Sequence, residues 1–242
     1  MRIDIVITGD HVSPDLVRGK TVIVIDTLRA TTVIITSLVN GAKSVVPVTT
    51  VEEGLGIMRR MENVVLGGER KSMKIDGFDF SNSPREYTRE VISGKNLILT
   101  TTNGTKAISR SKDGTRILIG ALVNAKAVAR KACGYAEDII IVNAGTDGRF
   151  SMDDFITGGA LIEEILSMKN ADLTDISKTA LMTYRNHKDI RSYVKEAAHF
   201  RILEDLGLQD DIDFCLQKDI FAIVPEFDHG VIKLPEGQIS LL

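Results

Sequence analysis

The amino-acid sequence predicts an α/β protein with a mostly parallel sheet that carries helices on both faces. One observation is a series of short runs rich in β-branched apolar residues, such as Thr21–Ile25, which are typical of strands buried on both faces. A second observation is that segments with helical periodicity separate these runs. Strands that alternate with helices favour a parallel sheet, because parallel neighbours need a crossover connection.

The first two thirds of the chain contain most of the predicted strands. A strand-like segment begins directly after Met1. Gly41 ends the first predicted helix, and Glu52 and Glu53 suit the first turn of the second, because acids favour a helix N-terminus. Pro84 suits the first position of another helix. Strands are expected at residues 21–25, 44–48, 63–66, 97–100, 116–119 and 138–142, with helices at residues 30–40 and 51–61.

The last third of the chain has a different character, with longer helical patterns and fewer strands. A long helix is expected at residues 155–168, and several shorter helices are expected at residues 177–206. Residues 220–224 and 231–234 are strand candidates, and the turn Asp228-His229-Gly230 indicates a hairpin.

Length and composition are those of a soluble globular protein. The 242 residues suffice for one α/β unit over residues 1–242, or for two closely packed lobes with a boundary near residues 125–150. A net charge of −3 gives no basic surface for nucleic acid, and no apolar run approaches the ~20 residues of a membrane span. Two cysteines without CxxC spacing indicate a reduced, cytoplasmic protein. We therefore expect neither a nucleic-acid nor a membrane partner, and a homodimer is a possible state.

Acidic, basic and hydroxyl side chains follow several predicted strands at the point where each strand ends. In open parallel sheets, ligands bind outside the carboxyl ends of the strands, so these residues form the candidate site. Guanidinium groups beside carboxylates predict an anionic substrate that is bound together with a cation. The candidates are Asp26, Arg29 and Thr31 after the strand at 21–25, Glu69 and Arg70 after the strand at 63–66, and Asn143, Gly145 and Asp154 after the strand at 138–142.

A threonine-rich turn at residues 100–105 joins an apolar strand to a helix-like segment. Its backbone N–H groups and hydroxyls predict a cradle for an anion at the helix N-terminus. Gly104 would let the backbone approach a ligand closely. The alternative is a polar turn in which Asn103 or Thr102 only caps the helix. The cradle would consist of Thr101, Thr102, Asn103, Gly104 and Thr105.

This mixture of carboxylates, arginines and N–H groups favours a phosphate ligand with Mg²⁺, which prefers oxygen ligands and shares substrate oxygens. Other phosphate chemistries lack their motifs in this chain. Neither Cys133 nor Cys215 is followed five residues later by Arg, and Leu28 stands where a phosphoaspartate enzyme would have a second acid. The chain also has no GxxxxGK[ST] loop. Metal-assisted hydrolysis or transfer at a phosphate remains.

Each acid also has a purely structural interpretation. Asp154 could cap its helix, Asp26 could pair with Arg29, and Glu69 with Arg70 could be a surface pair. Asp26 is the hardest to explain in this way, because an acid directly after five strand residues risks burial without a partner. No histidine has metal-ligand spacing, and none is expected to be catalytic; they are His11, His187, His199 and His229.

The loop at residues 71–83 is long for a connection inside a compact unit, and such loops are often functional. We expect it to fold over the strand ends, with Asn82 and Ser83 donating hydrogen bonds to the substrate. Phe78 and Phe80 would anchor it by burying their rings. The alternative is a solvated hairpin stabilised by Asp–Gly turn chemistry.

Several motifs follow one another in a specific order along nearly the whole chain. They are VIDTLRATT at residues 24–32, GER at 68–70, GFDFSNSP at 77–84, TTTNGT at 100–105, NAG at 143–145 and FSMDD at 150–154, with Asp213 and Val224-Pro225 beyond them. In this order they resemble the 2-phosphosulfolactate phosphatase family. One departure is Asn143, where many members are expected to have cysteine, so a cysteine nucleophile is not implied.

The resemblance implies hydrolysis of 2-phospho-3-sulfolactate to 3-sulfolactate and phosphate, with Mg²⁺ as cofactor, in coenzyme M biosynthesis. It also implies a topology that differs from the Rossmann fold. For this reaction, we expect Asp26 and Glu69 to bind Mg²⁺, with Asp154 as a third ligand or as the base for a metal-held water. Direct attack by water and a phosphoryl-carboxylate intermediate both stay open.

Two other functions also stay open. One is a phosphatase for another small 2-phospho-hydroxyacid, such as a phospholactate or phosphoglycolate. The other is a non-catalytic binder of small anionic metabolites. The carboxylates of Asp26, Glu69 and Asp154 argue against a binder, because unpaired acids repel an anionic ligand.

Overall fold

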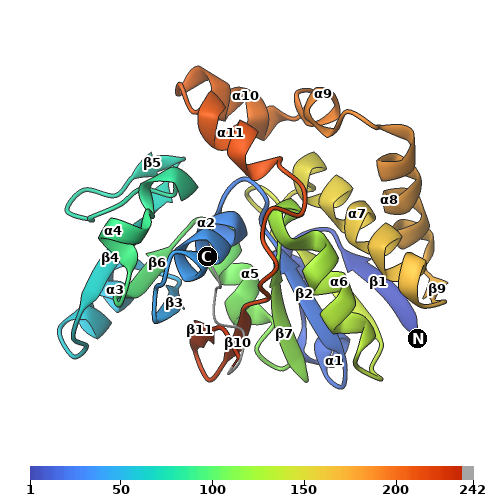
Figure 1. Cartoon of the computed structure of the whole chain (residues 1–242), viewed down its shortest axis with the longest axis horizontal. Coiled ribbons are helices and arrows are strands. Elements are labelled where there is room, and N and C mark those ends of the chain that lie inside the picture. Colours follow the sequence, from blue (N-terminus) through green and yellow to red (C-terminus); the bar gives the residue numbers. More distant parts are fainter. Residues whose placement is uncertain (236–242) are drawn as a thin grey trace.

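A computed structural model describes residues 1–235 of the chain, which form an α/β structure around one eleven-stranded sheet (Figure 1). The strands are β1 Arg2–Val6, β2 Thr21–Ile25, β3 Ser44–Val48, β4 Val64–Arg70, β5 Met73–Lys74, β6 Asn96–Thr100, β7 Arg116–Gly120, β8 Ile139–Asn143, β9 Asp172–Leu173, β10 Glu226–Asp228 and β11 Val231–Lys233. The predicted fold class, an α/β protein with a mostly parallel sheet, is confirmed.

The helices vary from one turn to five turns in length. They are α1 Pro14–Val17, α2 Ala30–Val39, α3 Val51–Met58, α4 Arg89–Ile92, α5 Gly104–Arg110, α6 Ala125–Cys133, α7 Met152–Met168, α8 Asp175–Asn186, α9 Ile190–Val194, α10 Ala198–Asp205 and α11 Gln209–Cys215. Three short 3₁₀ helices, η1 Gly9–His11, η2 Pro84–Glu86 and η3 Leu122–Asn124, complete the set in the described chain. Pro84 opens η2, as its fixed φ angle favours.

The sheet contains two parallel groups of strands that an antiparallel hairpin joins. Its strand order is β5-β4-β6-β3-β11-β10-β7-β2-β8-β1-β9. The hairpin strands β10 and β11 lie between β7 and β3. Each pairs antiparallel with its neighbour through one residue pair, Glu226 with Leu118 and Ile232 with Val45. Within the groups, the register aligns Ile25 with Asn143 and Gly68 with Thr100. The residues that follow these strands therefore lie side by side within each group.

Both faces of the sheet are buried, as the uninterrupted apolar strands predict. In β2, Val22 and Val24 pack into one core cluster with α2 and α5. Ile23 and Ile25 point to the opposite face and pack with α6, α7 and α8. The two clusters thus cover opposite faces of the same strand, because successive side chains of a strand alternate in direction.

The helices α9, α10 and α11 form a cap beyond the ends of the strands, at the top of Figure 1. A third core cluster holds the cap together and includes Phe200 and Leu203 from α10 and Ile212 from α11. The same cluster contains Leu28, which follows β2, and Ile156 from α7. The cap therefore rests directly on the turn that carries Asp26 and Arg29.

Some predicted elements differ in extent from the observed ones. The strand expected at residues 63–66 continues to Arg70, so the GER motif lies within β4. The strand expected at residues 220–224 is wrong, although the hairpin turn after it is present as β10 and β11. Residues 220–224 run extended, but Phe221 N–H donates to the Val123 carbonyl and Asn124 Nδ2 donates to the Ile223 carbonyl. These bonds to a helical turn and a side chain take the place of a strand ladder.

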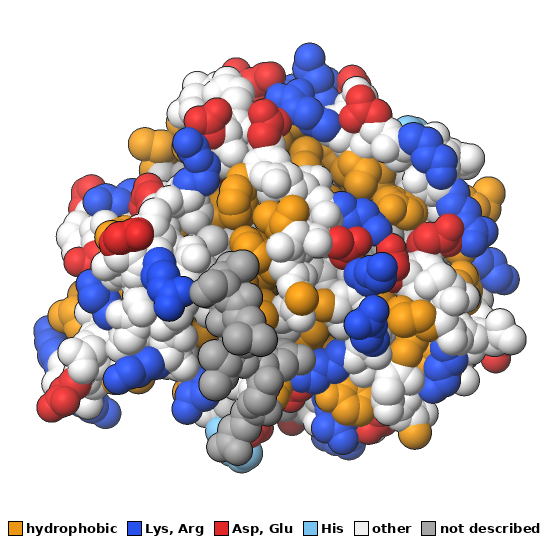
Figure 2. Space-filling model, viewed as in Figure 1, with side chains coloured by type: hydrophobic (Ala, Val, Ile, Leu, Met, Phe, Trp, Pro, Cys, Tyr) orange, Lys and Arg blue, Asp and Glu red, His pale blue; other side chains and the backbone are white. Residues whose placement is uncertain are grey.

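No helix in the described range, residues 1–235, is long and apolar enough to span a membrane. On the face shown in Figure 2, Lys and Arg side chains alternate with Asp and Glu side chains instead of gathering in one patch.

Candidate active site

A cavity of about 540 Å³ lies where the strand ends meet the cap. Seven of the predicted site residues line it: Asp26, Arg29, Glu69, Arg70, Asn82, Thr102 and Asn103. They come from the ends of β2, β4 and β6 and from the loop before η2. The other lining residues are Leu28, Lys71, Ser72, Thr146, Asp147, His199 and Ile202. The cavity therefore brings together residues of both parallel groups and of the cap.

Asp26 is held in place by the turn that follows β2. Its side-chain Oδ1 accepts a hydrogen bond from Ala30 N–H at 3.1 Å, and its backbone N–H donates to Thr31 Oγ1 at 3.0 Å. Burial raises the pKa of Asp26 to about 6, and the nearby charges of Asp153 and Glu69 act in the same direction. The fold therefore holds this carboxylate at a cost in stability.

Gly104 is required beside Asp26 because the backbone at position 104 approaches the turn after β2 very closely. A Cβ atom at position 104 would lie 2.5 Å from Asp26 Oδ2 and 2.7 Å from the Ala30 Cβ. Gly104 itself does not line the cavity. Its place in the TTTNGT motif is thus explained by the space that Asp26 needs.

Glu69 joins the end of β4 to the threonine-rich turn. Its Oε1 accepts a hydrogen bond from Thr102 N–H at 2.6 Å, and its Oε2 accepts hydrogen bonds from Ser72 N–H at 2.9 Å and Thr102 Oγ1 at 3.2 Å. Thr101 and Thr105 cap each other, since each backbone N–H donates to the other side-chain hydroxyl. Three N–H groups of the predicted anion cradle are therefore already bonded within the protein.

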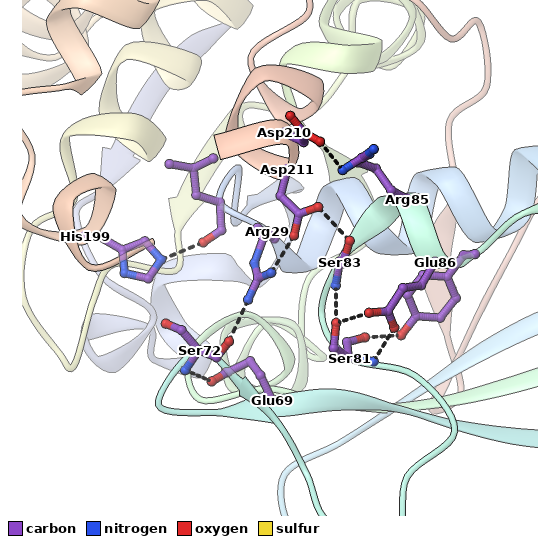
Figure 3. Close-up of polar contacts among 12 residues, drawn as sticks. Arg29, Glu69, Ser72, Ser81, Ser83, Arg85, Glu86, His199, Asp210 and Asp211 are labelled. Carbon is purple, nitrogen blue, oxygen red and sulfur yellow. Dashed lines mark hydrogen bonds and ion pairs between the residues drawn. The ribbon is translucent and has the colours of Figure 1, made fainter. Parts of the chain in front are cut away.

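The two arginines of the cavity have different electrostatic surroundings. Arg29 is only 2% exposed; its Nη1 donates to Asp211 Oδ2 at 2.6 Å and its Nη2 to the Ser72 carbonyl at 3.0 Å (Figure 3). Arg70 donates instead to neutral acceptors, the carbonyls of Glu69 and Thr49 and the Thr100 hydroxyl. Within residues 1–235, no carboxylate forms an ion pair with Arg70. The Arg29 charge is thus neutralised inside the protein, whereas the Arg70 charge is oriented but uncompensated.

Asp154 lies beside Asp26 but does not line the cavity. Its Oδ1 accepts a hydrogen bond from Thr27 N–H at 2.9 Å and its Oδ2 from Gly145 N–H at 3.0 Å. Burial raises the pKa of Asp154 well above its usual range, and the charges of Asp153 and Asp26 add to this effect. Asp154 therefore fixes the turns after β2 and β8. Gly145 bonds Asp154 and does not line the cavity.

Two buried asparagines in the described chain have side-chain amide atoms without a hydrogen-bond partner. Asn82 Oδ1 has none, although Asn82 lines the cavity, and neither amide atom of Asn143 has one. Asn143 is fully buried at the end of β8 and does not line the cavity. Ser83 also lies outside the cavity lining, since its Oγ donates to Asp211 Oδ1 at 2.6 Å. Of these three residues, only Asn82 faces the cavity.

A magnesium ion fits the acids of this cavity if the substrate supplies the remaining ligands. Within the described part of the chain, no group of three or more His, Cys, Asp and Glu side chains could hold a metal by itself. Mg²⁺ usually takes one or two carboxylates and completes its shell with waters and substrate oxygens. Asp26 and Glu69 line the same cavity, and burial has already desolvated Asp26.

Comparison with known proteins identifies the family of this chain. A family model described as 2-phosphosulpholactate phosphatase matches residues 7–230. The chain belongs to this family. A relative from Clostridium beijerinckii named probable 2-phosphosulfolactate phosphatase is 48% identical over 235 residues, which cover 96% of this chain and 99% of the relative. Relatives with the same name from Clostridium botulinum and Clostridium perfringens are 49% and 44% identical, over 97% and 100% of this chain and 100% and 99% of the relatives.

The structure also places residues at the site that were not predicted there from the sequence. His199 from α10 lines the cavity, and its Nε2–H donates to the Leu28 carbonyl at 2.9 Å. Asp211 is the buried partner of Arg29, whereas Asp213 is exposed and pairs with Arg191 at 2.6 Å. His199 and Asp211 lie in the cap, so no local pattern relates them to the strand ends. The helical periodicity of α11 places Asp211 beside the buried Ile212 and Cys215, and this was the available signal.

Proposed function

We propose that this chain hydrolyses 2-phospho-3-sulfolactate to 3-sulfolactate and phosphate. The observation that carries this proposal is one cavity that holds an uncompensated arginine, Arg70, beside two acids suited to a hard cation, Asp26 and Glu69. A small substrate with several anionic groups needs both kinds of partner. The membership of the chain in the 2-phosphosulfolactate phosphatase family supports the same substrate.

Arg70 is our candidate for binding one anionic group of the substrate. Three neutral acceptors hold its guanidinium in place, so little rotamer entropy is lost when an anion binds. Lys71 and Asn103 line the cavity and could add donors beside it. Arg29 is assigned a positioning role, because Asp211 already neutralises its charge.

We propose that Asp26 and Glu69 hold Mg²⁺ together with substrate oxygens. When bound, the ion would stabilise negative charge on the phosphate and lower the pKa of a coordinated water. The hydrogen bonds from Thr102 and Ser72 fix the Glu69 carboxylate, and Ala30 N–H fixes that of Asp26. Asp154 stays a candidate base, but its two backbone bonds favour a positioning role.

A panel of phosphate esters would test the proposed function. Phosphate release is measured from 2-phospho-3-sulfolactate, 2-phospholactate and phosphoglycolate, with Mg²⁺ and with EDTA. We expect the highest kcat/KM on the sulfonate substrate and a loss of activity in EDTA. Binding without turnover on every ester would instead support a binder of anionic metabolites. Equal rates on the three acids would show that the sulfonate is not recognised.

Replacing Asn82 by Ala is expected to lower kcat/KM by roughly tenfold, the loss of one hydrogen bond to a charged ligand. Asn82 lines the cavity, and its Nδ2 is the side-chain atom that would donate to an anionic group, because the amide oxygen can only accept. The matched control is Asn170→Ala, because Asn170 is exposed outside the cavity. Unchanged steady-state kinetics in Asn82→Ala would show that Asn82 has only a structural role.

The remaining expectations extend this proposal. They are a role in coenzyme M biosynthesis, a cytoplasmic location, a homodimer and the absence of nucleic-acid partners. An acid quench of a single turnover with radiolabelled substrate, followed by a search for phosphorylated enzyme, would separate direct attack by water from a phosphoryl-carboxylate intermediate.

A further inference from the structure

The cavity has two walls of different chemistry. Its polar wall comes from the ends of β4 and β6 and includes Glu69, Arg70 and Thr102. Its other wall contains the apolar side chains of Leu28 and Ile202. His199, which lies in α10 as Ile202 does, also lines the cavity and bonds the Leu28 carbonyl. Figure 3 shows His199 to the left of Arg29, whereas Ser72 and Glu69 lie below Arg29. A small substrate whose groups are all anionic finds donors and cation ligands on the polar wall, and Leu28 and Ile202 offer it neither.

The packing of the cap does not explain why an apolar side chain, that of Ile202, is exposed. Phe200 and Leu203, its neighbours in α10, are fully buried and already form the core of the cap. Ile202 is 47% exposed, and Leu206, which caps the C-terminal end of α10 one turn further on, is 40% exposed. Residues four positions apart lie on one helix face, so the two side chains form an apolar strip that begins in the cavity.

The volume of the cavity also indicates space for a larger, partly apolar substrate. A volume of about 540 Å³ lies well inside the range of roughly 300–1,000 Å³ that encloses drug-sized ligands. A three-carbon acid with a phosphate and a sulfonate is much smaller than such ligands. Space therefore remains beside Leu28 and Ile202 after the polar wall has bound its anion.

We propose that the site also hydrolyses 2-phospho acids that carry an apolar or aromatic substituent on C3, and that Leu28, His199 and Ile202 contact this substituent. This inference rests on the proposed function, because it uses the same polar wall for the phosphate. The reaction is unchanged: the bond from phosphorus to the C2 oxygen breaks, water supplies the new oxygen on phosphorus, and a proton of that water ends on the C2 hydroxyl. No further reactant is needed.

The test compares three substrates that differ only at C3: 2-phospho-3-phenyllactate, 2-phospholactate and 2-phospho-3-sulfolactate. We expect kcat/KM for the phenyl substrate to exceed that for 2-phospholactate by at least about tenfold, since each buried CH₂ equivalent contributes roughly fourfold to binding. In Ile202→Ala, the ratio of these two kcat/KM values should fall by about fivefold or more. The matched control is Ile220→Ala, because Ile220 is 41% exposed but lies outside the cavity.

Each outcome decides between the two proposals. A phenyl substrate that is hydrolysed no faster than 2-phospholactate overturns the inference, as does a ratio that Ile202→Ala leaves unchanged. If 2-phospho-3-sulfolactate is hydrolysed in the same assay, the proposed function survives that result. Hydrolysis of the phenyl substrate but not of the sulfonate supports the apolar wall and overturns the assignment of the sulfonate substrate.

Discussion

Replacing Asp26 by Asn is expected to abolish phosphate release and, in the same variant, to stabilise the fold at neutral pH. Asp26 is buried in the cavity, and we propose that it binds the cation that offsets the charge on the phosphate. Loss of several kcal/mol of transition-state stabilisation corresponds to a decrease in kcat/KM of at least about a thousandfold. The amide keeps the shape of the carboxylate and an oxygen that can accept from Ala30.

The gain in stability follows from the raised pKa of Asp26. Because burial raises it from 3.8 to about 6 in the folded protein, the folded state binds the proton more tightly than the unfolded chain does. Stability is therefore lost as the pH rises from about 4 to about 6, and the full penalty is present above pH 6. The shift corresponds to about 2–3 kcal/mol, which Asp26→Asn should recover at pH 7.5 but not at pH 4.

Urea unfolding at both pH values, in EDTA, measures this difference, and phosphate release measures the loss of activity. The matched control is Asp113→Asn, because Asp113 is exposed and lies outside the cavity. If Asp26→Asn keeps near-normal activity in saturating Mg²⁺, the assignment of Asp26 to the metal is wrong. If it destabilises the protein at pH 7.5, the carboxylate is stabilised by contacts that outweigh its burial.

Replacing Asp211 by Ala is expected to destabilise the protein by about 3–5 kcal/mol, the cost of leaving a buried charge without its partner. Arg29 is almost fully buried, and Asp211 is its ion-pair partner at 2.6 Å. Asp211 Oδ1 also accepts the hydrogen bond from Ser83 Oγ, so the same substitution removes one bond between the cap and the segment before η2 (Figure 3). Activity should fall as well, because Arg29 lines the cavity.

The neighbouring Asp210 provides a matched control on the same helix. Asp210 pairs with Arg85 at 2.7 Å, but both side chains are more than half exposed. Exposed pairs contribute only about 0–1 kcal/mol, so Asp210→Ala should change the free energy of unfolding by less than that amount. Equal destabilisation in Asp210→Ala and Asp211→Ala, measured by urea unfolding, would contradict a special role for the buried pair.

A double replacement separates stability from function. Arg29→Met combined with Asp211→Leu removes both buried charges and should recover much of the stability that Asp211→Ala loses, since apolar pairs of similar volume replace buried ion pairs well. We expect the double variant to stay poorly active, because Met cannot bond the Ser72 carbonyl beside Glu69. Full activity in the double variant would show that Arg29 only stabilises the cap.

The central strands and the polar residues after them could be predicted because their signals are local. Apolar β-branched runs specify strands such as β2 and β8, and their burial on both faces follows from that pattern. Residues 220–224 have the same apolar character and are not a strand. The difference is that Phe221 and Ile223 find hydrogen-bond partners in η3, a neighbour that no local pattern identifies.

The candidate site was predicted in part for the same reason. Asp26, Glu69 and Arg70 directly follow or end strands, and the carboxyl ends of those strands border the cavity. Asp154 also lies close to Asp26, but the backbone N–H groups of Thr27 and Gly145 occupy its oxygens. Which atoms a carboxylate faces depends on the packing of three turns, and residue types alone do not define that packing.

The sequence by itself determined the α/β class, the positions of the buried strands and the family, because these follow from short-range patterns and from the order of motifs along the chain. Only the tertiary structure decided that the C-terminal hairpin joins the two groups of strands. It also decided that Asp211 neutralises Arg29 across 182 residues and that His199 reaches the cavity from the cap. Contacts between such distant residues depend on how whole elements pack against each other. Closing a longer loop costs little extra entropy, so these contacts form readily although no local sequence pattern indicates them.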